Sequence, residues 1–184
     1  MAGRGALSAA LAALYRGADA EQRKQAEAWL QTWQTSQEAW SVADSALHDD
    51  ASSAEERIFA AQTLRTKVSV DFEELPGDAA LSLRDSLYTL LVKYATTGPA
   101  AVRTTLCVAV AACATHLPPA AWADAGGLVR WSVARFQRED VNVAVAATLQ
   151  LLAVLPEEVN STRIAVRRRG SALRTKRTAM ALTC

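Results

Sequence analysis

The 184-residue chain is 51% hydrophobic and 21% charged, which excludes an intrinsically disordered protein and allows one core or several structural repeats. With 8 glycines, 5 prolines and abundant alanine, the composition favours helices over a loop-rich β fold. The net charge of +1 hides an asymmetry, because residues 163–184 contain seven basic and no acidic residues, leaving 13 basic against 19 acidic residues before them. Such an acidic body disfavours direct binding to nucleic acid.

The amino-terminal stretch "MAGRGALSAALAALYRGADA" has features of both a targeting segment and a first structural helix. Leu7, Leu11 and Leu14 stand at i, i+4 and i+7, which is the spacing of a helix that faces a core. The stretch is also only weakly hydrophobic. We therefore expect a structural helix over 5–15.

Helical patterns then recur in pairs, separated by short breaks that contain glycine, proline or polar residues. The expected pairs are 5–15 with 20–35, 37–48 with 54–70, 78–96 with 100–116, and 119–136 with 139–155. From the second pair onward the pairs begin about 41 residues apart, a period typical of HEAT and armadillo solenoids. We expect an all-α fold over 1–160, a right-handed α-α superhelix of about four helix pairs, with a globular all-α bundle as the alternative.

Within these helices, the residue pattern predicts starts and buried faces. Ser53 and Glu56 have the spacing of a capping box, which predicts the start of the 54–70 helix. Trp29, Trp33 and Trp40 are interpreted as core residues, because no basic residue lies between them as a base-stacking surface would require. The predicted inner face of the last helix consists of Val141, Val145, Leu149, Leu152 and Leu155.

No pattern of catalytic or metal-ligating residues stands out in the sequence. His48 beside Asp49 and Asp50 is interpreted as a polar helix end rather than a metal cluster. Cys107 and Cys113 lie in an apolar helical run and are expected to be buried thiols. There is no glycine-rich phosphate loop and no apolar run of the ~18 residues that span a bilayer. We therefore expect no enzyme, no cofactor, no metal site and no membrane span.

Five segments carry a family resemblance: "QEAWSVADSAL" at 37–47, "FAAQTLRTKV" with the "ELP" and "LRDSLYTLL" that follow it, and "LLAVLPEEV" at 151–159. In order and spacing they resemble the amino-terminal region of nuclear transport receptors of the importin-β superfamily, in the transportin-SR branch. The resemblance covers roughly residues 8–169. It implies a superhelix of HEAT repeats whose first repeats bind the GTP-bound form of the small GTPase Ran.

In this family the second helix of each pair meets Ran. For the 54–70 helix, the resemblance implies that one face meets Ran-GTP and that the other is buried in the repeat. The implied contacts are Gln62, Arg65, Thr66 and Ser69, and the implied buried residues are Ile58, Ala61, Leu64 and Val68. Reversing the charges of Arg65 and Lys67 together is expected to weaken Ran binding without loss of helix.

The resemblance further implies a monomeric receptor that shuttles between nucleus and cytoplasm with serine/arginine-rich cargo and contacts nucleoporins. It fades after residue 169, where 170–184 show little helical periodicity. Residues 161–184 are basic and are expected to form a poorly ordered, solvated tail. Binding of RNA by this tail is a further alternative. The alternative function for the whole chain is a HEAT-repeat scaffold that binds another protein and has no GTPase partner.

Overall fold

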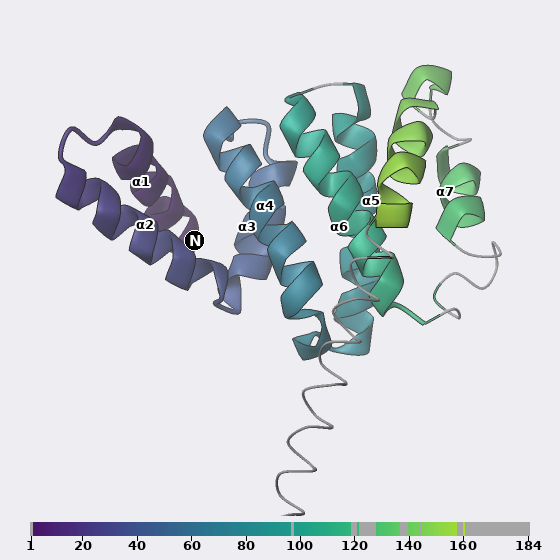
Figure 1. The fold of residues 1–184 in the computed structure, drawn as a ribbon, viewed down its shortest axis with the longest axis horizontal. Coiled ribbons are helices and arrows are strands. Elements are labelled where there is room, and N and C mark those ends of the chain that lie inside the picture. Colours follow the sequence, from purple (N-terminus) through teal and green to yellow (C-terminus); the bar gives the residue numbers. More distant parts are fainter. Residues whose placement is uncertain are drawn as a thin grey trace, which may run out of the picture.

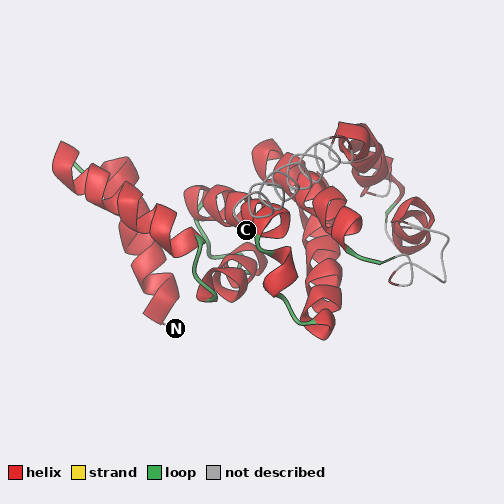
Figure 2. Cartoon of the chain, turned by 60° about the horizontal axis from the view of Figure 1, so that its bottom comes forward, coloured by secondary structure: helices red, strands yellow, loops and turns green. Residues whose placement is uncertain are grey.

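A computed structural model describes residues 2–96, 98–118, 121, 128–136, 140–143, 145–157 and 160. The helices have the following bounds: α1 Ala2–Arg16, α2 Ala20–Gln34, α3 Glu38–His48, α4 Ala54–Val70, the 3-10 helix η1 Phe72–Glu74, α5 Gly77–Thr96, α6 Ala100–His116 and α7 Leu128–Phe136. Residues 141–143 and 145–157 are also helical. Among the described residues there is no β-strand, as Figure 2 shows. The predicted basic tail lies outside the described residues.

The helices form antiparallel pairs that stack in a row, α1 with α2, α3 with α4, and α5 with α6 (Figure 1). The second helices of the second and third pairs, α4 and α6, also pack on each other. The helices α2, α4 and α6 therefore form one layer, in front in Figure 1, and the first helices form the layer behind it. This arrangement confirms the predicted all-α fold of stacked HEAT-type pairs.

The breaks between helices have identifiable causes in the sequence. Asp19 caps α2, because its side chain accepts a hydrogen bond from the Glu21 amide at 3.0 Å. Gly98, between α5 and α6, has φ of +83°, and a Cβ there would lie 2.8 Å from the ring of Tyr94. Only glycine fits that position, so the α5–α6 turn depends on it. Pro99 then precedes the first turn of α6.

Two hydrophobic cores run through the row of helices. The smaller one joins α1, α2 and α3, and its buried members are Leu7, Leu11, Leu30, Trp33 and Ala39. The burial of Leu7 and Leu11 confirms the predicted structural helix at the amino terminus. The larger one extends from α3 to the helix at 145–157, and α6 lies at its centre. Eight residues of α6 are buried, five of them alanine or cysteine, so neighbouring backbones can approach closely.

The predicted inner face of the last helix is wrong. Val141, Val145, Leu149 and Leu152 are 73%, 51%, 62% and 42% exposed, and of the predicted set Leu155 is partly buried. The helix instead buries Ala147 and Leu151. Its sequence is apolar on nearly every side, so helical periodicity alone cannot show which side meets α6. In a solenoid an inner helix has two apolar sides, one for each neighbouring repeat.

Candidate partner-binding surface

Helix α4 begins at the predicted capping box. The Ser53 hydroxyl accepts a hydrogen bond from the Glu56 amide at 3.1 Å, and the Glu56 carboxylate accepts one from the Ser53 amide at 3.0 Å. Two amides that the helix leaves without partners at its start are thus satisfied. Because the start of α4 is fixed, the direction of each later side chain around the helix is fixed too.

One side of α4 is fully buried between α3 and α6. Ala61, Leu64 and Val68 are each 0% exposed, as predicted, and Ile58 packs at the edge of the same core. Ala60, which the sequence analysis did not single out, is 0% exposed as well. This side therefore positions α4 within the repeat and leaves the opposite side for contacts.

The opposite side is a polar stripe, which we call the α4 stripe: Gln62, Arg65, Thr66 and Ser69. All four side chains are exposed. They stand at i, i+3, i+4 and i+7, so they follow one another along one side of the helix. The Ser69 hydroxyl donates to the Arg65 carbonyl at 3.0 Å, within the helix. The structure thus places the four predicted contacts together on an accessible surface, and whether they meet Ran stays a prediction.

Lys67 does not belong to this surface, although the sequence analysis paired it with Arg65 as a basic residue whose charge reversal would weaken Ran binding. Its side chain is 1% exposed, and its Nζ lies 2.8 Å from Asp71 Oδ2 and 5.1 Å from the centroid of the Trp40 ring. The ammonium is therefore paired inside the repeat, and reversing its charge would disrupt the fold. The expectation that a joint reversal of Arg65 and Lys67 leaves the helix intact is not supported.

The carboxyl-terminal end of helix α2 contacts α4. Gln34 Nε2 donates to Thr63 Oγ1 at 3.0 Å, and Thr63 Oγ1 in turn donates to the Phe59 carbonyl at 2.9 Å. The Trp33 ring packs on Phe59 with 6.1 Å between ring centroids. These contacts join the end of α2 to the amino-terminal half of α4.

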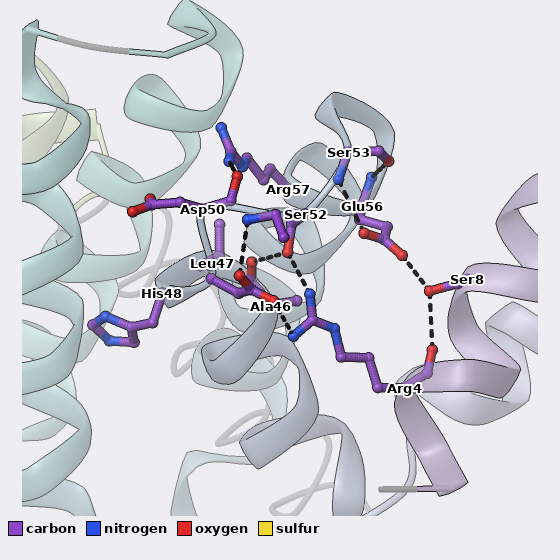
Figure 3. A network of polar contacts seen from close by, with 12 residues as sticks. Arg4, Ser8, Ala46, Leu47, His48, Asp50, Ser52, Ser53, Glu56 and Arg57 are labelled. Atoms are coloured by element: carbon purple, nitrogen blue, oxygen red, sulfur yellow. Dashed lines mark hydrogen bonds and ion pairs between the residues drawn. The ribbon is translucent and has the colours of Figure 1, made fainter.

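The loop between α3 and α4, residues 49–53, is held from the preceding repeat (Figure 3). Arg4 of α1 pairs with Asp49 at 2.7 Å and donates to the Ser52 hydroxyl at 2.8 Å. Ser8 of α1 donates to the Glu56 carboxylate. The pKa of Asp49 is lowered, first by the hydrogen bond from the Ala51 amide and then by Arg4.

The same loop is held from the following repeat as well. Lys93 of α5 pairs with Asp50 at 2.7 Å and donates to the His48 carbonyl at 2.7 Å. The hydrogen bond from Lys93 lowers the pKa of Asp50. Tyr94 donates to the Leu47 carbonyl at 2.9 Å. Three successive helix pairs are therefore joined at this loop. The sequence did not reveal these contacts, because the partners are more than 40 residues apart.

His48, Cys107 and Cys113 are residues whose types could bind a metal or react, and their contacts in the structure indicate neither role. His48 Nε2 lies 2.9 Å from the Ser86 hydroxyl, and within the described residues no three His, Cys, Asp or Glu side chains are grouped to bind a metal. Burial raises the pKa of both Cys107 and Cys113 to about 12, so these thiols stay protonated. In the described part of the chain, no helix is both long and apolar enough to cross a membrane.

The α4 stripe lies within a segment of the chain that matches a known protein family. Residues 26–93, which include α3, α4 and most of α2 and α5, match the family described as the importin-beta N-terminal domain. This part of the chain is an importin-beta N-terminal domain. The α4 stripe and the joined 49–53 loop both belong to it.

Relatives of the importin-beta N-terminal domain align over most of the chain. Transportin MOS14 of Arabidopsis thaliana is 47% identical over 165 residues, which are 88% of this chain and 16% of the relative. Importin-13 of Homo sapiens is 35% identical over 179 residues, 95% of this chain and 18% of the relative. An uncharacterized protein of Schizosaccharomyces pombe is 37% identical over 158 residues, 85% of this chain and 16% of the relative. The chain thus spans less than a fifth of the length of these relatives.

Proposed function

We propose that this chain is the Ran-binding part of a nuclear import receptor and that it binds Ran-GTP through the α4 stripe. The observation that carries the proposal is the exposure of Gln62, Arg65, Thr66 and Ser69 along one side of α4, inside the importin-beta N-terminal domain. Arginine and small polar side chains on a rigid helix suit a polar protein surface, because they supply directed hydrogen bonds.

The receptor is non-enzymatic and moves between cytoplasm and nucleus. It delivers cargo of the serine/arginine-rich splicing-factor class, as the transportin-SR resemblance implies, and Ran-GTP binding in the nucleus releases that cargo. The match to a protein named transportin supports this branch. Cargo and Ran-GTP oppose each other's binding, which is a negative coupling between two sites.

The test is a titration of the 184-residue chain against Ran loaded with GTP and, separately, with GDP. We expect selective binding to the GTP form, with circular dichroism showing that the chain is helical under the same conditions. A folded chain that binds neither form, or both equally, contradicts the proposal. A folded chain that binds neither form supports the HEAT-repeat scaffold without a GTPase partner.

A further inference from the structure

Trp29 on α2 is exposed, although the sequence analysis assigned it to the core. Its side chain is 38% exposed, whereas Trp33 and Trp40 are 4% and 8% exposed and are core residues as predicted. Tryptophan presents more apolar area than any other side chain, so an indole left in water at this position is costly. A partner that covers it would recover that free energy.

The exposed indole is held in one position. Its ring stacks on Trp33 with 6.2 Å between centroids and 17° between planes. Trp33 is fixed in turn, because its Nε1 donates to the Glu38 carboxylate at 3.0 Å. A side chain that is already ordered loses little entropy when a partner covers it, so more of its buried area is converted into affinity.

The indole is also connected to the side of α4 on which the α4 stripe lies. Trp33 packs on Phe59, which precedes Gln62 by three residues and Thr66 by seven and therefore lies on the same side of α4. Two ring contacts thus connect Trp29 to Phe59, on the side of α4 that carries the stripe. An interface of standard size covers about 800 Å² per partner, which is enough to include both features.

We propose that Trp29 is the apolar anchor of the same interface and packs against an apolar patch on Ran-GTP, with the α4 stripe as its polar flank. This inference rests on the proposed function. Interfaces concentrate their binding energy in a few buried aromatic and arginine side chains surrounded by weaker polar contacts, and Trp29 with Arg65 fits that pattern.

The experiment compares Trp29→Ala with Leu81→Ala in the full chain. Leu81 is a matched control, because it is 40% exposed and lies on α5, in the other layer of helices. We expect Trp29→Ala to weaken Ran-GTP binding by about tenfold or more and Leu81→Ala to change it by less than about twofold. Circular dichroism and thermal unfolding establish that each variant keeps its helices.

A second measurement does not depend on the stability of Trp29→Ala. The chain is labelled with 5-fluorotryptophan, and the fluorine signal that disappears in Trp29→Phe is assigned to Trp29. We expect this signal to shift when Ran-GTP is added and to stay in place with Ran-GDP.

The outcomes separate this inference from the proposed function. If the wild-type chain binds Ran-GTP selectively and Arg65→Glu weakens it, while the Trp29 signal stays in place and Trp29→Ala binds normally, only the role of Trp29 is overturned. If the wild-type chain does not distinguish the two nucleotide states, both are overturned.

Discussion

Two basic residues on α4, two positions apart, have opposite surroundings. A helix turns about 100° per residue, so side chains at i and i+2 point to nearly opposite sides. Arg65 is exposed on the α4 stripe. Lys67 is buried against Trp40 and paired with Asp71. The first is available to a partner and the second stabilises the repeat, although both look alike in the sequence.

Charge reversal at the two positions should separate these roles in stability. We expect Lys67→Glu to lower the free energy of unfolding by about 3 kcal/mol or more, because it places two carboxylates together in a buried setting. Arg65→Glu, the matched control on the same helix, should change it by less than about 0.5 kcal/mol. Thermal unfolding followed by circular dichroism measures both. Similar unfolding temperatures for the two variants would contradict the burial of Lys67.

Ran-GTP binding should depend on the charge of Arg65. We expect Arg65→Glu to weaken Ran-GTP binding by about tenfold, because a charge-assisted contact becomes a repulsive one. Arg130→Glu is the control, since Arg130 is exposed on α7 and the change in net charge is the same. Isothermal titration calorimetry gives both affinities. Equal losses for the two variants would indicate a general charge effect rather than a contact at Arg65.

At the scale of elements, the 49–53 loop connects α3 with α4 and is linked to α1 and α5 by solvent-exposed ion pairs. The pKa of Asp49 lies below its usual value of 3.8. A lowered carboxyl pKa in the folded state adds stability above the unfolded pKa, and that stability is lost as the pH falls through the folded pKa. The link between α1 and the loop should therefore weaken only in acid.

This link can be measured with Asp49→Asn. We expect the variant to unfold at a lower temperature than the wild-type chain at pH 7, and the difference to shrink as the pH falls below 3.8. Glu27→Gln, at an exposed position in the middle of α2, is the control. A difference that is the same at pH 7 and pH 3 would show that the Asp49 charge does not stabilise the folded chain.

Two substitutions in the helix at 145–157 test which of its faces is buried. We expect Leu151→Ala to lower the free energy of unfolding by about 2–5 kcal/mol, because it opens a cavity at a side chain that is 2% exposed. Leu149→Ala, two residues away and 62% exposed, should change it by less than about 0.5 kcal/mol. Urea unfolding measures the free energy of unfolding of both variants. A larger loss in Leu149→Ala than in Leu151→Ala would support the inner face predicted from the sequence.

At the scale of the whole molecule, the features that depend on local sequence patterns were predicted correctly. The capping box at Ser53 and Glu56 and the helix pairs follow from the spacing of residues along the chain, whereas the exposed side of α4 was implied by the family resemblance. The errors concern tertiary contacts. Lys67 is buried because Trp40 of another helix covers it, and the last helix is apolar on both sides. Periodicity shows that a helix has a face, and only its neighbours decide which face is buried.

The 49–53 loop has a consequence for the kinetics of association. Arg4 of the preceding pair and Lys93 of the following pair both bind it, so we expect the spacing between the first three helix pairs to be set before any partner arrives. A surface of fixed shape needs no slow rearrangement after the first encounter. Mixing the chain with Ran-GTP in a stopped-flow instrument should then give a single exponential phase whose observed rate constant rises linearly with Ran-GTP concentration, without a plateau.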